Sequence, residues 1–385
     1  SWVGGEQRRM RLLVLRSAWG LRGLRDAPAR TLAGLRSAGF DGLEASLEDL
    51  GASAEARAEA VRAARDEGLS LIISAYSSWA NYEGPATEQL LSPPSAHLDR
   101  LTRELEAIAE ASVAAGPLSP VLRVNAHSGS DAWSEDEAAA FLASAVEAAS
   151  RIGEALPPVS HETHRGRALC CPFATARLLR RVPQLRLTSD LSHWVVKTER
   201  MLDTAPEQEL LLRQVAPAVD HLHARVGTPQ APQVASLAES ATTARAAERF
   251  YGWWEACWAA AEARSLSSRD STLTATVEYG PAELGEDGQV LAGSYSPLDL
   301  HGRHVSGVGL DDTLADAAAA LRSRFERWAR ASAAQRRALA ANLSPRPPLP
   351  LQVARERGEQ GGGAGVIMFG TVARYERSTQ HSMPK

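Results

Sequence analysis

The sequence repeats one pattern eight times, in which a short apolar run is followed by a stretch with the spacing of an amphipathic helix. Strands that alternate with helices indicate a parallel sheet, because each pair of parallel strands needs a long crossover connection. Eight such units predict a closed (β/α)8 barrel of the TIM type, and 385 residues are enough for one such barrel. The predicted strands are 12–16, 42–47, 69–76, 121–126, 158–164, 185–190, 219–226 and 273–279.

The helices predicted between these strands have recognisable ends. Asp26 is the expected N-cap of the first helix and Gly39 its stop, while Ser134 and Glu137 predict a capping box at the fourth. A doubly wound open sheet is the alternative architecture, but no glycine-rich phosphate loop follows the first strand. The predicted helices are 27–38, 53–67, 94–115, 134–156, 172–182, 207–215, 241–264 and 313–331, with 332–343 as a C-terminal helical extension.

The composition changes after residue 343. Residues 344–350 are rich in proline and 361–363 are three glycines, which is typical of linkers and loose tails. We therefore expect an N-terminal extension over 1–10, a barrel with its helical extension over 11–343, and a linker and tail over 344–385.

Charge and cysteine content argue against several classes of protein. The net charge of −4 gives no electrostatic footprint for nucleic acid or an anionic membrane, and no apolar run approaches the roughly 20 residues that span a bilayer. Three cysteines, two of them adjacent, do not make a disulfide framework. We therefore expect a protein of the cytoplasm or of a reducing organelle lumen, not a secreted one, that binds neither nucleic acid nor membrane.

The seventh predicted strand carries unusual chemistry on one face. Because side chains alternate along a strand, His221, His223 and Arg225 share one face and apolar residues share the other. Burying two imidazoles and a guanidinium costs several kcal/mol unless a partner compensates them. A metal ion or an anionic substrate is the expected partner.

Carboxylates stand at the ends of the neighbouring predicted strands. Glu162, Asp190 and Glu278 are predicted to point inward and to converge with His223 at the mouth of the barrel, where the active sites of such barrels lie. Three carboxylates and one imidazole suit one divalent ion, Mn²⁺, Mg²⁺ or Co²⁺, with Zn²⁺ as a further candidate. For each carboxylate taken alone, a buried salt bridge to a nearby arginine is the alternative.

Two motifs give the chain a family resemblance. Residues 162–167 read Glu-Thr-His-Arg-Gly-Arg and residues 223–227 read His-Ala-Arg-Val-Gly, with 187–194 between them. With these motifs the chain resembles the xylose-isomerase-like TIM-barrel superfamily of sugar phosphate isomerases and epimerases, over roughly residues 11–330. The resemblance implies metal dependence and a small carbohydrate substrate, which is a sugar, a sugar phosphate or an inositol-type ketone.

The resemblance also implies roles for individual residues. Glu162, Asp190, His223 and Glu278 would hold the ion, the two glutamates would transfer the proton, and His193 would bind a substrate oxygen. The expected reaction is proton abstraction next to a carbonyl, through an enediolate, which gives isomerisation or epimerisation. Family members carry a second acidic residue six positions after the first glutamate, where this chain has an alanine. We therefore expect the contacts that recognise the sugar in this chain to differ from those of the family members.

Other residues are candidates for substrate binding. Arg165 and Arg225, together with Arg167, have the fork geometry that holds a phosphate or a carboxylate. His127 begins a Ser-Gly-Ser loop that could cradle an oxyanion, with an ordinary surface loop as the alternative. Glu44 either binds substrate or forms a salt bridge inside the barrel.

Two other functions stay open at this point. An endonuclease IV-like metal phosphodiesterase needs further histidines on strands two to four, for which His127 is the one candidate, and the acidic balance opposes DNA binding. A non-catalytic TIM-barrel protein that binds a sugar is the other. The aromatic residues 251–258 indicate helix packing or a subunit contact, so a homo-oligomer also stays open.

Overall fold

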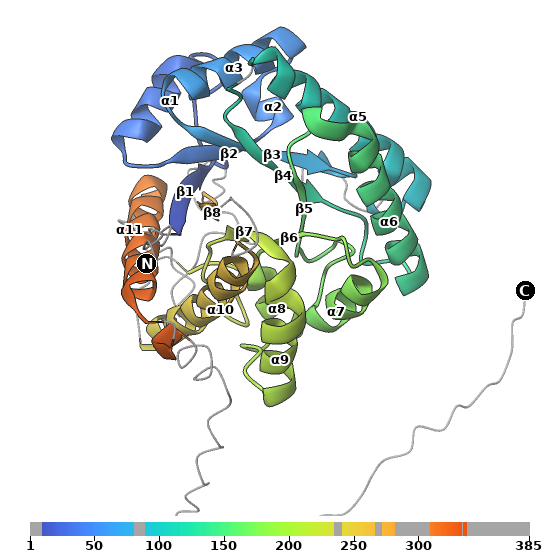
Figure 1. Cartoon of the computed structure of the whole chain (residues 1–385), viewed down its shortest axis with the longest axis vertical. Helices are drawn as coiled ribbons and strands as arrows, with labels where there is room; N and C mark the ends of the chain where they lie inside the picture. Colours follow the sequence, from blue (N-terminus) through green and yellow to red (C-terminus); the bar gives the residue numbers. More distant parts are fainter. Residues whose placement is uncertain are drawn as a thin grey trace, which may run out of the picture. The chain divides into compact units, whose positions relative to one another are not determined.

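The computed structural model describes residues 10–80, 89–116, 118–234, 241–265, 272–281, 309–332 and 334–336. Within these residues eight parallel strands follow one another in sequence order and close into a barrel, with helices around it (Figure 1). The predicted (β/α)8 architecture is confirmed and the open sheet is wrong. The strands are β1 Arg11–Ser17, β2 Gly42–Ser46, β3 Ser70–Tyr76, β4 Val121–His127, β5 Val159–Glu162, β6 Leu187–Ser189, β7 Val219–His223 and β8 Thr272–Val277.

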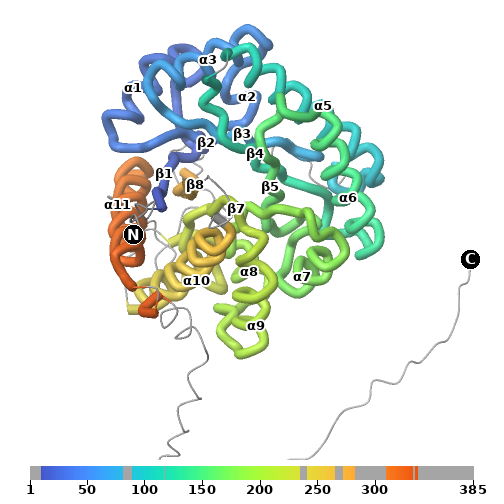
Figure 2. The backbone as a smooth tube through the Cα atoms, in the orientation of Figure 1, coloured from blue at the N-terminus to red at the C-terminus, as the bar shows by residue number. Residues whose placement is uncertain are grey.

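The chain winds once around the barrel, so that β1 lies beside β8 (Figure 2). Most predicted helices are present, but the short α2 and α8 were not expected. The predicted helix 207–215 ends early and continues as a π-helical turn over Leu211–Val215. The helices are α1 Pro28–Ser37, α2 Leu47–Leu50, α3 Ala54–Asp66, α5 Pro94–Ala114, α6 Glu135–Ile152, α7 Pro172–Arg181, α8 Leu191–Thr198, α9 Ala205–Leu210, α10 Ala241–Ser265 and α11 Leu310–Arg330.

The ends of the helices follow local chemistry. Ser134 and Glu137 form both halves of the predicted capping box on α6. The predicted cap by Asp26 is wrong: the N-cap is Ala27, without a side-chain bond, and the fixed φ of Pro28 begins α1 instead. Gly39, just after α1, has φ of +84°, a conformation that glycine adopts without strain.

Strand register decides which side chains face the inside of the barrel. Glu162 pairs with Thr188, Thr188 with His221, and His221 with Thr274. Residues that are directly opposite in a parallel sheet point to the same face, so this row lies on one side of the sheet. The hydrogen bond of 2.8 Å between His221 Nδ1 and Thr274 Oγ1 agrees with that placement. The interior of this barrel is therefore largely polar, while the main apolar core lies between strands and helices.

Several strands are shorter than predicted, β5, β6 and β7 most clearly. β5 ends at Glu162 and β7 ends at His223, so Arg165 and Arg225 lie on the loops that follow them. Residues 1–9 of the predicted N-terminal extension, the predicted tail, and the helical extension beyond residue 336 lie outside the described residues. Among the helices described, none combines the length and the apolar character that a membrane span requires.

Candidate metal centre

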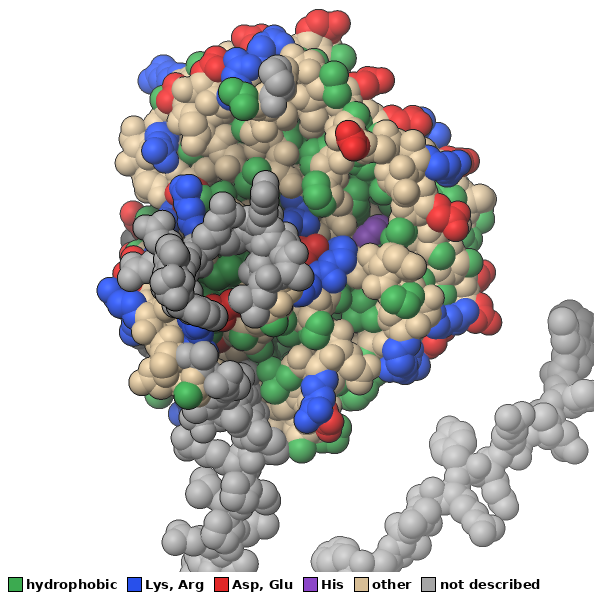
Figure 3. All heavy atoms as spheres, viewed as in Figure 1, with side chains coloured by type: hydrophobic (Ala, Val, Ile, Leu, Met, Phe, Trp, Pro, Cys, Tyr) green, Lys and Arg blue, Asp and Glu red, His purple; other side chains and the backbone are tan. Residues whose placement is uncertain are grey.

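The four residues predicted to bind a metal come together at the carboxyl ends of the strands. Each of Glu162, Asp190, His223 and Glu278 offers one donor atom within 4.8 Å of the donor atoms of the others. Glu162 and His223 end β5 and β7, Asp190 is the N-cap of α8, and Glu278 follows β8. The first three are buried, while the Glu278 side chain keeps 17% of its surface exposed. Acidic, basic and histidine side chains gather in the hollow of this face (Figure 3).

Three donor atoms of this centre lack hydrogen bonds. Glu162 Oε1, His223 Nδ1 and Glu278 Oε2 are buried and have no hydrogen-bond partner among the described residues. They face each other instead: His223 Nδ1 lies 3.1 Å from Glu278 Oε2 and 3.6 Å from Glu162 Oε1. Buried polar atoms normally form hydrogen bonds, so three neighbouring atoms without them call for an explanation. Their donor types fit a divalent cation.

The electrostatics of the centre point to a shortage of positive charge. Burial, opposed by Arg225 and reinforced by Glu278, raises the pKa of Asp190 to about 6. Burial alone would lower the pKa of His223, but Glu278, Glu44 and Glu162 outweigh it and raise that pKa well above its ordinary value. The field that favours a protonated imidazole here also favours a bound cation.

Glu44 supports His223 from inside the barrel. Its carboxylate lies 3.0 Å from His223 Nε2 and 3.1 Å from His221 Nε2, and it accepts hydrogen bonds from Asn125 at 2.9 Å and from Thr276 at 2.5 Å. A carboxylate on the far nitrogen commonly orients a metal-binding histidine and leaves the other nitrogen for the metal. The sequence left two roles open for Glu44, a contact with substrate or a salt bridge inside the barrel. This geometry favours the salt bridge inside the barrel.

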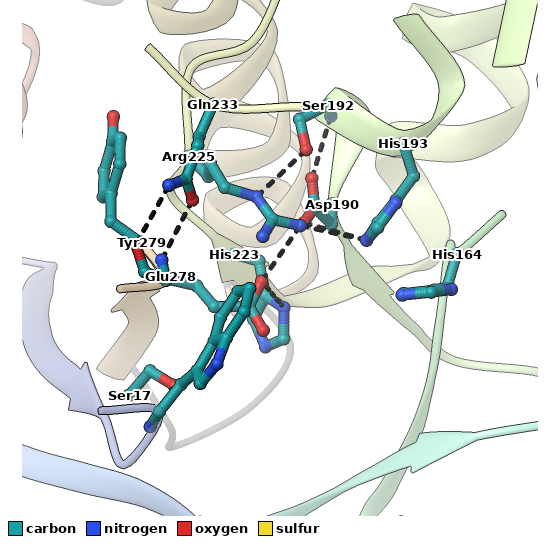
Figure 4. Close-up of polar contacts among 12 residues, drawn as sticks. Ser17, His164, Asp190, Ser192, His193, His223, Arg225, Gln233, Glu278 and Tyr279 are labelled. Carbon is teal, nitrogen blue, oxygen red and sulfur yellow. Dashed lines mark hydrogen bonds and ion pairs between the residues drawn. The ribbon is translucent and has the colours of Figure 1, made fainter. Parts of the chain in front are cut away.

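Arg225 contacts four side chains at the centre, and its Nε donates a hydrogen bond of 3.1 Å to Ser192 Oγ (Figure 4). Its guanidinium lies 2.5 Å from Asp190 Oδ2, 3.3 Å from Glu278 Oε2 and 2.9 Å from His193 Nε2. Because a guanidinium only donates, His193 Nε2 must accept, which assigns the imidazole proton to Nδ1. That Nδ1 is buried and has no hydrogen-bond partner among the described residues.

The remaining predicted contacts lie on the β4 and β5 side. His127 Nε2 lies 2.9 Å from Glu162 Oε2, so this histidine is part of the centre and not of a surface loop. Arg167 points away, toward the oxygens of Ser78 and the carbonyl of Trp79. Arg165, half-buried, follows β5 on the same loop.

Sequence reasoning missed two residues that build the centre. Asn125, on β4, donates to Glu44 and to Glu162 Oε2, each at 2.9 Å, and its inward position follows from the alternation along that strand. Gln233 makes two hydrogen bonds with the backbone of Gly280, at 2.9 and 3.0 Å, and so fixes the segment that carries Glu278. No sequence signal marks Gln233, because its partner is backbone.

The centre and the strand order together define the class of molecule, a (β/α)8 barrel with candidate metal ligands at the ends of its last four strands. No family model matches the sequence, and no curated protein matches it. Several solved structures resemble its fold, all with TM-scores below 0.5.

Three of these solved structures are a dehydratase, an epimerase and a barrel protein with bound magnesium. The probable 3-DHS dehydratase AsbF of Bacillus anthracis is 13% identical, covers 80% of this chain and 98% of its own, and has a TM-score of 0.47. A D-psicose 3-epimerase in the presence of D-fructose is 14% identical, with 81% and 98% covered and a TM-score of 0.48. A xylose isomerase-like TIM barrel protein of Mycobacterium smegmatis, in complex with magnesium, is 14% identical, with 83% and 98% covered and a TM-score of 0.48.

Proposed function

We propose that this protein is a divalent-metal-dependent isomerase or epimerase of small carbohydrates. The observation that carries the proposal is the group of three buried donor atoms on Glu162, His223 and Glu278 that form no hydrogen bond among the described residues, beside the carboxylate of Asp190. Three carboxylates and one imidazole suit Mn²⁺, Mg²⁺ or Co²⁺. The sequence resemblance to sugar isomerases and epimerases supports the choice of reaction.

The ion, when bound, supplies Lewis-acid polarisation of a substrate carbonyl. Glu162 and Glu278 are the bases within reach of the carbon beside that carbonyl. Glu162 Oε2 is held by His127 and Asn125, which leaves Oε1 directed at the centre. Glu278 reaches the partly exposed edge, where a proton can exchange with solvent. One glutamate removes the proton and the other returns it, on the opposite face for epimerisation or at the neighbouring carbon for isomerisation.

His193 and Arg225 complete the polar surface that meets the substrate. With its proton on Nδ1, His193 donates a hydrogen bond to a substrate oxygen, because its Nε2 is occupied by Arg225. The charge of Arg225, 1% exposed, lies beside the carboxylates and favours the anionic form of the reacting group. The two residues therefore position the substrate and stabilise negative charge as it develops.

The test is hydrogen exchange between substrate and solvent. The metal-free chain is loaded with Mn²⁺ and incubated in D₂O with a panel of keto-sugars, sugar phosphates and inositol-type ketones, and mass spectrometry follows deuterium on carbon. We expect exchange with at least one compound, and a loss of about 10²- to 10⁴-fold in Glu278→Gln. The matched control is Glu255→Gln, which changes a buried carboxylate on α10 that pairs with Arg324. No exchange by the loaded wild type, or full exchange by Glu278→Gln, would contradict the proposal.

A further inference from the structure

A second cluster of metal-ligating side chains adjoins the centre. It consists of His127, Glu162 and His164, whose donor atoms lie within 4.8 Å of one another. All three are buried, with exposures of 4%, 1% and 6%. We propose that this cluster is a second divalent-cation site, bridged to the first by the carboxylate of Glu162, which takes Zn²⁺ in preference to Mg²⁺.

The position of Glu162 is that of a bridging ligand. Its Oε2 lies 2.9 Å from His127 Nε2, whereas its Oε1 lies on the side of His223, 3.6 Å from Nδ1. The two oxygens of one carboxylate therefore face two different sets of donors. Pairs of metal ions in enzymes are about 3.5–4 Å apart, a spacing that a shared carboxylate produces.

The histidines of the second cluster are oriented as metal ligands are. The Nδ1 of His164 lies 2.5 Å from the backbone carbonyl of Arg165, which can only accept, so Nδ1 carries the proton and Nε2 carries the lone pair. A bond from the second ring nitrogen to a backbone carbonyl is the usual support of a metal-binding histidine. His127 is held by stacking on Tyr76, with ring centroids 4.4 Å apart.

The donor set determines which ion the second site accepts. Two imidazoles and one oxygen of the shared Glu162 carboxylate provide little negative charge. Hard ions such as Mg²⁺ need oxygen ligands. Imidazole nitrogen suits Zn²⁺. The positive charge of Arg167 acts on His164 and lowers the affinity of the cluster for any cation. The first centre therefore fills with Mg²⁺ or Zn²⁺, and the second fills with Zn²⁺ alone and more weakly.

A purely structural role for the same residues is the competing explanation. His127 and Glu162 would then be a buried hydrogen-bonded pair, and His164 a ring packed on His193 with centroids 3.7 Å apart (Figure 4). The two explanations differ in the number of ions that the chain binds. They can therefore be separated without knowing the substrate.

The experiment counts bound ions on the full chain. Metal-free protein is titrated with Zn²⁺ and separately with Mg²⁺ by calorimetry, and elemental analysis after desalting checks the counts. We expect two Zn²⁺ and one Mg²⁺ for the wild type, and one Zn²⁺ and one Mg²⁺ for His164→Gln. For Asp190→Asn, which alters the first centre alone, we expect one Zn²⁺ and no Mg²⁺. His97→Gln, a buried histidine that bonds Ser77 and Gln89, is the matched control and keeps the wild-type counts.

The outcomes separate the two sites. One Zn²⁺ in the wild type, or two in His164→Gln, overturns the second site and leaves the first centre intact. No ion of either kind in the wild type overturns both. His127→Gln removes the other imidazole and should lose the same single Zn²⁺, so the result does not depend on one variant, and circular dichroism verifies that each variant is folded.

Discussion

The cluster around Glu44 and the four-residue centre are neighbours in the barrel and differ in how many of their buried polar atoms form hydrogen bonds. Around Glu44, both carboxylate oxygens are occupied by donors from Asn125, Thr276 and two histidines. At the four-residue centre, the atoms that face each other have no hydrogen bonds among the described residues. Both clusters are buried and charged, and both have donor atoms at metal-binding distances. Burial of charge therefore does not distinguish the cluster around Glu44 from the four-residue centre, whereas the three donor atoms without hydrogen bonds do.

The difference follows from position along the strands. Glu44 lies within β2, where the inward side chains of neighbouring strands surround it with donors. Glu162, Asp190 and Glu278 lie where the strands end. There Asp190 is paired with Arg225, whereas Glu162 Oε1 and Glu278 Oε2 receive no hydrogen bond among the described residues. Strand ends in a (β/α)8 barrel are where functional side chains can gather without disturbing the sheet.

The first prediction tests this comparison through the largest expected effect, which is the stabilisation of the folded chain by a bound cation. An ion that binds the folded chain alone raises the free energy of unfolding by about 2.7 kcal/mol at 100 times its dissociation constant. We expect Mn²⁺ to raise the unfolding free energy of the wild type by this amount, and EDTA to reverse it. Glu278→Gln should show little or no gain, as measured by urea denaturation with and without Mn²⁺. An equal gain in both proteins would place the ion elsewhere.

The second prediction concerns the support that Glu44 gives to His223. Glu44→Gln exchanges an acceptor for a group that also donates, so His223 Nε2 loses its carboxylate partner. Loss of such a partner typically weakens metal binding about 10- to 100-fold, and calorimetric titration with Mn²⁺ measures this change.

Thr276→Val is the control for that substitution. It removes one hydrogen bond to the same carboxylate and leaves the partner of His223 in place. We expect a loss of about 1.5–3 kcal/mol in the free energy of unfolding, with Mn²⁺ affinity unchanged. If Thr276→Val weakened Mn²⁺ binding as much as Glu44→Gln, the special role of the carboxylate would be wrong.

The fold could be predicted from the sequence because strand and helix periods alternate without interruption, and strand ends could be located to within a few residues. The structure also brings the four predicted ligands together, since one inward residue at the end of each of four adjacent strands must converge. Their role as ligands stays a prediction.

Other features of the centre depend on contacts that no local pattern encodes. Arg225 pairs with Asp190, which lies 35 positions away in the sequence. Glu44 meets His223 across the barrel, 179 positions away. From the sequence, each of these side chains can be placed inside or near the barrel mouth. The acceptor with which each hydrogen-bond donor pairs cannot be predicted in this way. That assignment depends on the stagger of the strands, which only the closed barrel determines.

The last prediction concerns the pH dependence of stability. It compares His223 with His161, a buried histidine outside both clusters. Burial lowers the pKa of His161 to about 4, because no carboxylate offsets it. As pH falls below 6.5, the unfolded chain takes up a proton at this residue before the folded chain does, so stability decreases. The loss from this residue between pH 7 and pH 5 is about 2 kcal/mol. The raised pKa of His223 has the opposite sign: its contribution is present below pH 6.5 and is lost as pH rises.

We expect His161→Gln to reduce the loss of stability between pH 7 and pH 5 by about 2 kcal/mol, as measured by urea denaturation at both pH values with EDTA present. Between pH 7 and pH 8 this imidazole is largely neutral in both states, so the variant and the wild type should change nearly in parallel there. An unchanged loss in the variant would mean that a charge stabilises the imidazolium of His161 in the fold. The contrast between an isolated buried histidine and one surrounded by carboxylates would then not hold.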